Sequence, residues 1–153
     1  MRSVKGWERL RRRLERIPKA VKRAAQPAVT DAAGDVAATI KILTPVDDGD
    51  LRDSIAVTPG GERTPAHSQP GGSMTVPENA AMVSAGNTKV RYAHLVEFGS
   101  PPHIAGGIFE GAEIPAVPPK PFFWPGFKLS RKRAARKIKR GITKAVKDTK
   151  NGN

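Results

Sequence analysis

The stretch TPVDDGDLRDSI, residues 44–55, separates two parts of the chain with different patterns. The sequence before it reads as helix, and the sequence after it reads mostly as short strands and loops. Asp48 or Asp50 is expected to cap a short helix that begins in this stretch. Leu51 and Ile55 are four residues apart, so one helical turn can bury both side chains. The stretch is therefore predicted to be a corner between a helical part and a strand-rich part.

The sequence before the corner carries one helical stripe of apolar side chains. Over residues 3–43 these side chains recur every three or four positions. Pro18 and Pro27 argue against a straight rod, because an interior proline kinks a helix. We expect a basic helical arm over residues 1–17, a bend, and an alanine-rich helix to about residue 43. The stripe could also form a coiled-coil seam, but its small side chains favour packing within its own domain.

Short strands and two long loops are predicted after the corner. Strands are expected over 54–58 and 79–86. The segments 59–77 and 100–119 are rich in proline and glycine and are too irregular for regular structure, although the second could hold a hairpin. Residues 90–99 fit a short helix that Gly99 ends.

A basic helix is predicted at the C-terminal end of the chain. It opens within PKPFFWPGF, residues 119–127, because proline is tolerated in the first helical turn. It continues into the basic segment 128–153. The face expected to be buried consists of Phe123, Phe127, Ala134, Ala135, Ile138, Ile142 and Val146.

The predicted fold class is α+β in a single domain of 153 residues. We expect a small antiparallel sheet packed with a long, kinked N-terminal helix, a short middle helix and a basic C-terminal helix. Alanine supplies 20 of the apolar residues, so the core is thin. A chain with little core often completes its burial against another copy of itself.

Positive charge is concentrated at the two ends of the chain. The net charge is +13, yet residues 24–127 carry six Lys/Arg against eleven acids. Such segregation is consistent with a polyanionic or acidic partner that binds the ends. It is equally consistent with two helices whose charges simply keep them solvated. The candidate contacts to an acidic surface or to phosphate are Arg11, Arg12, Arg13, Arg131, Lys132, Arg133, Arg136, Lys137 and Arg140.

Most chemistry is excluded by residue type and spacing. The chain has no cysteine, so it offers neither a thiolate ligand nor a cysteine nucleophile. Its three histidines are not spaced as metal ligands, and DDGD lacks the rest of a calcium-loop pattern. No apolar run is long enough to span a membrane, and no secretory signal is expected. We therefore expect no cofactor, no metal site, no catalytic residues and no enzyme activity.

Three motifs in order resemble a family of small siphophage neck and minor tail proteins. They are TPVDDGDLRDSI, YAHLVEFGS and PKPFFWPGF, and the resemblance covers about residues 25–145 with the two long loops unmatched. Asp48, Ser100 and Gly126 depart from the residues usual in the family, all at turns. The motif residues are Thr44, Pro45, Asp47, Gly49, Leu51, Arg52, Ser54, Ile55, Tyr92, Ala93, Glu97, Phe98, Gly99, Pro121, Phe122 and Pro125.

The resemblance implies a tail-completion or tail-terminator protein of the virion neck, assembled in the host cytoplasm. Such a protein forms a ring, commonly a hexamer, that caps the tail tube and docks to the head-closure or connector ring. Its partners would be further copies of itself, the head-closure protein and the tail tube protein. It could also lie transiently close to packaged DNA, and no membrane contact is expected. The alternative from another class is a basic, architectural nucleic-acid-binding protein, which the basic ends favour and the acidic middle disfavours.

Two structural hypotheses accompany the resemblance. Arg52 and Glu97 are each the charged residue within an otherwise apolar motif, so an ion pair between them is expected to join the corner to the short helix. The loops 59–77 and 100–119 are expected to reach adjacent rings, and deletion of residues 60–75 is expected to leave the subunit folded but to block tail joining.

Overall fold

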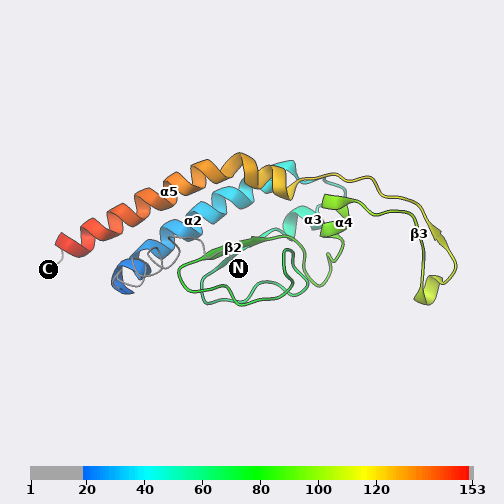
Figure 1. Cartoon of the computed structure of the whole chain (residues 1–153), viewed down its shortest axis with the longest axis horizontal. Coiled ribbons are helices and arrows are strands. Elements are labelled where there is room, and N and C mark those ends of the chain that lie inside the picture. Colours follow the sequence, from blue (N-terminus) through cyan, green and yellow to red (C-terminus); the bar gives the residue numbers. More distant parts are fainter. Residues whose placement is uncertain (1–18, 152–153) are drawn as a thin grey trace, which may run out of the picture.

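The computed structural model describes residues 19–151 as an antiparallel pair of long helices packed over a small strand-rich body (Figure 1). The helices are α2 (Lys19–Leu43) and α5 (Phe123–Asn151). The body contains α3 (Asp50–Asp53), β1 (Ala56–Pro59), β2 (Ala81–Ser84) and α4 (Ala93–Phe98). A separate hairpin contains β3 (His103–Ile104), the 3-10 turn η1 (Gly107–Phe109) and β4 (Glu113–Ile114). The α+β fold class predicted from the sequence is confirmed. The predicted basic arm over 1–17 and the bend at Pro18 lie outside the described residues.

Two glycines of α5 let the helix backbones approach closely. A side chain at Gly126 would lie 2.8 Å from the Cα atom of Ile40, and one at Gly141 would collide with Ala28. These contacts show that α5 runs antiparallel to α2. Pro27 lies inside α2 without ending it.

The buried stripe of α5 is shifted from the predicted one. Phe127, Ala135 and Ile142 were expected to be buried but are exposed. The buried positions instead recur every three or four residues along a different stripe. This stripe includes glycine and serine, so a search for apolar side chains alone does not find it. The buried or half-buried positions of this stripe are Phe122, Gly126, Ser130, Ala134, Ile138, Gly141 and Ala145.

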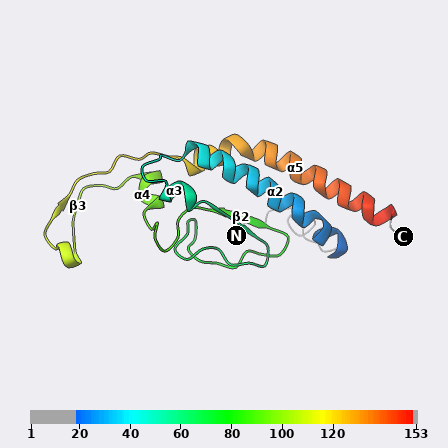
Figure 2. The ribbon, with the colours of Figure 1, turned by 180° about the vertical axis from the view of Figure 1, so that it is seen from behind.

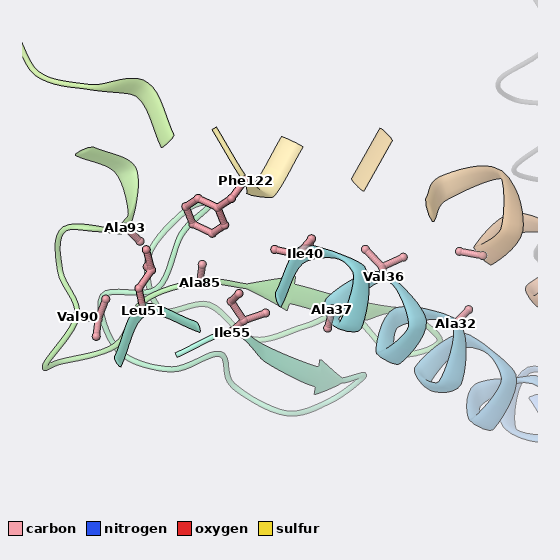
Figure 3. Packing of buried hydrophobic residues seen from close by; sticks show 11 residues of the cluster. Ala32, Val36, Ala37, Ile40, Leu51, Ile55, Ala85, Val90, Ala93 and Phe122 are labelled. Carbon is pink, nitrogen blue, oxygen red and sulfur yellow. The ribbon is translucent and has the colours of Figure 1, made fainter. Parts of the chain in front are cut away.

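The main core lies where the corner meets the helix pair (Figure 3). Leu51 and Ile55 are both buried, as their spacing predicts. They pack with Ile40 of α2 and with Phe122, which precedes α5. A smaller cluster of Val21, Ala25 and Ala145 joins the far ends of the helices. The corner thus connects the body to the helix pair.

β1 and β2 form an antiparallel two-stranded sheet in which Val57 pairs with Val83. The long segment between them is predicted to be an irregular loop, yet it folds back on the body. The N–H of Val76 donates to the carbonyl of Glu62 at 2.8 Å, and Gln69 and Ala85 bond each other at 2.8 and 2.9 Å. Thr64, Ser68 and Val76 are buried. The segment 59–77 therefore belongs to the body and does not project from it.

The other long segment, 100–119, does project. Backbone hydrogen bonds between Ser100 and Val117, at 3.0 and 2.9 Å, close its base. From there the chain extends past the end of the body, away from the C-terminal end of α5, in both opposite views (Figures 1 and 2). We call residues 100–119 the arm.

Candidate assembly surfaces

The corner is held by side chains that bond to nearby backbone. The Thr44 hydroxyl donates to the carbonyl of Ile40 at 2.8 Å, at the end of α2. Asp48 accepts the N–H of Asp50, the first residue of α3, at 2.9 Å, whereas the N-cap position itself is Gly49, which has no side chain to cap the helix. Gly49 between them has φ of 94°, a left-handed value that favours glycine.

Ser54 joins the corner to the strand-rich body. Its hydroxyl donates to the carbonyl of Leu51 at 2.6 Å and accepts the N–H of Gly86 at 3.0 Å. Ser54 is buried, so both of its bonds are shielded from water. One serine side chain thus links two segments that are 32 residues apart.

An acidic group faces Tyr92 beside the corner. Asp50 forms an ion pair with Lys89 at 2.6 Å, and this bond raises the pKa of Lys89. The pKa of Tyr92 is also raised, first because burial disfavours the phenolate and then because Asp48, Asp50 and Asp47 repel it. The three carboxylates therefore lie close enough to Tyr92 to disfavour its ionised form.

Glu97 caps the N-terminus of α5. Its Oε2 accepts the backbone N–H groups of Phe122 at 2.7 Å and Phe123 at 2.8 Å, and its Oε1 accepts that of Trp124 at 3.1 Å. The first N–H groups of a helix have no partner within the helix, and a carboxylate there also meets the positive end of the helix dipole. Glu97 is buried, and these three bonds compensate its desolvation.

The prediction of an ion pair between Arg52 and Glu97 is wrong. Within the described part of the chain Arg52 contacts Asp53, at 3.7 Å, and Glu97 contacts the amides of α5. The sequence held a signal for this role: α5 begins at PFF, which has no Ser, Thr, Asp or Asn to cap it. A helix start without a local cap indicates that a distant acceptor is needed.

The base of the arm is fitted around Gly99 and α4. A side chain on Gly99 would lie 2.6 Å from the carbonyl oxygen of Val117, and its φ of 73° favours glycine. Lys120 donates its backbone N–H to the carbonyl of Val96 at 2.8 Å. Pro121 then leads directly into the capped start of α5, and Pro125 lies in its first turn. The last two sequence motifs therefore meet at one place.

The arm presents an apolar tip. Gly107 and Gly111 have positive φ values that make the tip turn. Ile108 is 97 % exposed and Phe109 is 72 % exposed. The whole arm carries two acidic residues, Glu110 and Glu113, and no lysine or arginine.

An apolar groove of about 450 Å³ lies between α2, β2 and α5. Its lining includes Val36 and Ile40 of α2 and Met82 and Val83 of β2. From α5 the lining includes Trp124 and Phe127, which are 43 % and 38 % exposed, and Arg131, which adds a positive charge. We call this feature the helix groove. The sequence predicted Phe127 to be buried, and its exposure here is part of the shifted α5 stripe.

The outer face of α5 is basic. The candidate contacts Arg131, Lys132, Arg133, Arg136 and Arg140 are all exposed. Lys137 is different, because it pairs with Asp35 of α2 at 3.0 Å and bonds the Asp31 carbonyl. Arg11, Arg12 and Arg13 lie outside the described residues.

Metal-binding and membrane-spanning features are not found between residues 19 and 151. No group of three or more His, Cys, Asp or Glu side chains in this range could hold a metal ion. In the same range no helix is long and apolar enough to cross a membrane.

Comparison with models of known protein families gives a match to a family of phage tail components. The family model described as "Bacteriophage HK97-gp10, putative tail-component" matches residues 8–99, or 92 of the 153 residues. The match includes the corner and α4 with Glu97, whereas PKPFFWPGF lies beyond it. Comparisons with curated proteins and with solved structures gave no match. A match over more than half of the chain establishes the family, and the resemblance predicted from the motifs is confirmed: the chain belongs to the HK97-gp10-like family of bacteriophage tail components.

Proposed function

We propose that the chain is a tail-completion or tail-terminator subunit of the virion neck, which forms a ring, a hexamer, at the head-proximal end of the tail tube. The ring would cap the tube and dock to the head-closure ring. The observation that carries this proposal is the family match over residues 8–99, which includes the corner and α4. The family itself indicates the coarser role, a structural tail component of the phage virion.

The surfaces of the described residues support self-assembly. The arm exposes Ile108 and Phe109, and the helix groove exposes Trp124 and Phe127. Exposed apolar features on different parts of a small subunit are typical of surfaces that bind other proteins. A structural role in which no bond is made or broken needs no catalytic group, and we propose that the protein is not an enzyme.

Charge supports the same role. Arg133 and Arg136 are exposed on α5, whereas the body exposes acids such as Asp53, Glu62 and Glu78. We propose that the basic face of α5 contacts the acidic body of a neighbouring subunit. Complementary potentials of this kind steer association and fix orientation, and they weaken as salt rises.

The rival function is architectural binding of nucleic acid by the basic face of α5. That face has many cations, which would bind phosphates without sequence preference. Within the part of α5 after Leu129 the described residues include no aromatic side chain on which a base could stack. The rival therefore rests on charge alone.

Size-exclusion chromatography with light scattering, with and without duplex DNA, separates the two functions. The proposal predicts a discrete oligomer that dissociates as salt rises and that does not bind duplex DNA at physiological salt. Arg136→Glu should weaken the oligomer, whereas the matched body variant Arg91→Glu should not. A monomer that shifts duplex DNA would support the rival and contradict the ring.

A further inference from the structure

The arm and the helix groove are complementary features at different places on the same chain. The arm ends in two large apolar side chains, Ile108 and Phe109, that nothing in the described structure covers. The helix groove offers an apolar volume of about 450 Å³, which lies within the range of sites that enclose a ligand. The exposed apolar tip lacks an apolar surface to pack against, and the groove provides such a surface.

The chain's own arm does not occupy this groove. Its base is fixed by the Ser100–Val117 hydrogen bonds and by the bond from Lys120 to Val96. From this base the arm leads away from the helix pair, which is clear in both views (Figures 1 and 2). The tip is therefore exposed and lies away from the groove of its own chain (Figures 1 and 2).

Charge favours a second copy as that molecule. The arm carries Glu110 and Glu113 next to its tip and has no lysine or arginine. The groove has Arg131 in its lining, and Lys128 and Lys132 are exposed on the same helix. An acidic arm entering a groove with a basic edge brings opposite charges together around an apolar centre, which is the usual anatomy of a specific interface.

We propose that the tip of the arm, Ile108 and Phe109, inserts into the helix groove of a neighbouring copy of the same chain. The two contacting surfaces differ, so the interface is heterologous. Repetition of a heterologous contact generates a closed ring or an open filament. The inference rests on the proposed ring and names the contact that builds it.

Disulfide trapping tests the contact directly, because the chain has no cysteine of its own. Phe109→Cys and Ala135→Cys each introduce one thiol at an exposed position, the first on the arm tip and the second in the groove lining. Mixed and oxidised, the two variants are expected to form a covalent dimer that contains one chain of each. The matched control is Ala38→Cys, which is exposed on α2 but does not line the groove, and which should form no dimer with Phe109→Cys.

Three results would overturn the proposal. They are a dimer formed only between two Phe109→Cys chains, a disulfide within one chain when both substitutions are combined, and no adduct. Light scattering of the unmodified protein distinguishes failure of the arm contact from failure of the proposed ring. An oligomer whose Phe109→Cys and Ala135→Cys variants form no mixed disulfide rejects the arm contact alone, whereas a monomer that binds duplex DNA rejects the proposed function.

A polar tip gives a second, independent readout. Because both tip residues are exposed, the double variant Ile108→Ser/Phe109→Ser should keep its far-ultraviolet circular dichroism. Its oligomer should dissociate at a concentration about 100-fold higher or more, since two large apolar side chains are no longer buried. Leu129→Ser removes an exposed apolar side chain of α5 outside the groove lining and should leave the oligomer unchanged. Equal effects of the two variants would contradict the proposal.

Discussion

Glu97 of α4 accepts the backbone N–H of Phe122 at 2.7 Å, across 25 residues of chain. The bond joins the motifs YAHLVEFGS and PKPFFWPGF, which are separated in the sequence by residues 101–118 of the arm. It fixes the start of α5 to α4, and the same junction fixes the base of the arm. Phe122 in turn is buried in the main core beside Ile40 and Leu51 (Figure 3). The corner, the cap and the arm are therefore parts of one connected structure.

Loss of the Glu97 cap should destabilise the subunit. Glu97→Ala leaves three N–H groups at the start of α5 without an acceptor, so the free energy of unfolding should fall by about 2–3 kcal/mol. Glu97→Gln keeps one carbonyl acceptor and should cost less. Chemical denaturation measures both, with the exposed Glu78→Gln as control. A loss below about 0.5 kcal/mol for Glu97→Ala would show that the cap adds little to stability.

The close approach of α2 and α5 depends on Gly126. Gly126→Ala places a methyl group 2.8 Å from the Ile40 Cα atom, so the helices must separate, and we expect a loss of about 1–3 kcal/mol. Gly34→Ala is the matched control, because a side chain there meets nothing within 4 Å. That variant should gain about 0.5–1 kcal/mol from helix propensity alone. Thermal or chemical unfolding gives both values, and a stabilising Gly126→Ala would mean that the helices are not packed as described.

Tyr92 should titrate above its ordinary pKa of 10.0, because burial and then Asp48, Asp50 and Asp47 disfavour its phenolate. It is the only tyrosine in the chain, so tyrosinate absorbance reports on this site alone. Folding favours the neutral phenol, so the stability it contributes is fully present below pH 10 and is lost as pH rises through the raised pKa.

Removal of one neighbouring carboxylate tests the electrostatic part of this shift in the pKa of Tyr92. Asp48→Asn should lower the pKa of Tyr92 towards its ordinary value, because one repelling charge is removed, whereas Asp148→Asn on α5 should not change it. A midpoint in the folded protein equal to that in denaturant would contradict this account of the corner.

The two long segments should respond differently to deletion. Removal of residues 60–75 should destabilise or unfold the subunit, because it deletes the buried Thr64 and Ser68 and the bonds to Val76 and Ala85. This replaces the sequence-based expectation that the subunit would stay folded. Replacement of residues 102–115 by a short turn should keep the fold, because the Ser100–Val117 bonds remain, and should block oligomer formation. Circular dichroism and light scattering distinguish these outcomes, and an arm-deleted protein that still assembles would show that the arm only adds length.

Much of the fold could be predicted from local patterns. The spacing of Leu51 and Ile55 predicted their joint burial, Gly99 predicted the end of α4, and the prolines of PKPFFWPGF predicted the start of α5. These signals are local because a turn, a cap or a helical face depends on neighbours within a few residues.

The parts that could not be predicted depend on distant partners. Charge predicts Arg52 as the partner of Glu97, but the backbone amides of Phe122, Phe123 and Trp124 satisfy it. The missing local cap at the start of α5 indicates that an acceptor is needed, but it does not show which distant residue supplies it. The α5 stripe was misplaced because Gly126 and Gly141 are covered by close helix approach, which apolar spacing does not register. The segment 59–77 folds back through backbone hydrogen bonds, which its proline and glycine content does not predict. The shape of the helix groove depends on the packing of three separate elements, so no local pattern predicts it either.

Native mass measurement of the full chain at low and high salt tests the central claim most directly. The account predicts one closed species at low salt with six times the 16.4 kDa mass of the chain, which dissociates to monomers as salt rises. An open series of increasing masses, or a monomer that gains mass only when duplex DNA is added, would contradict it.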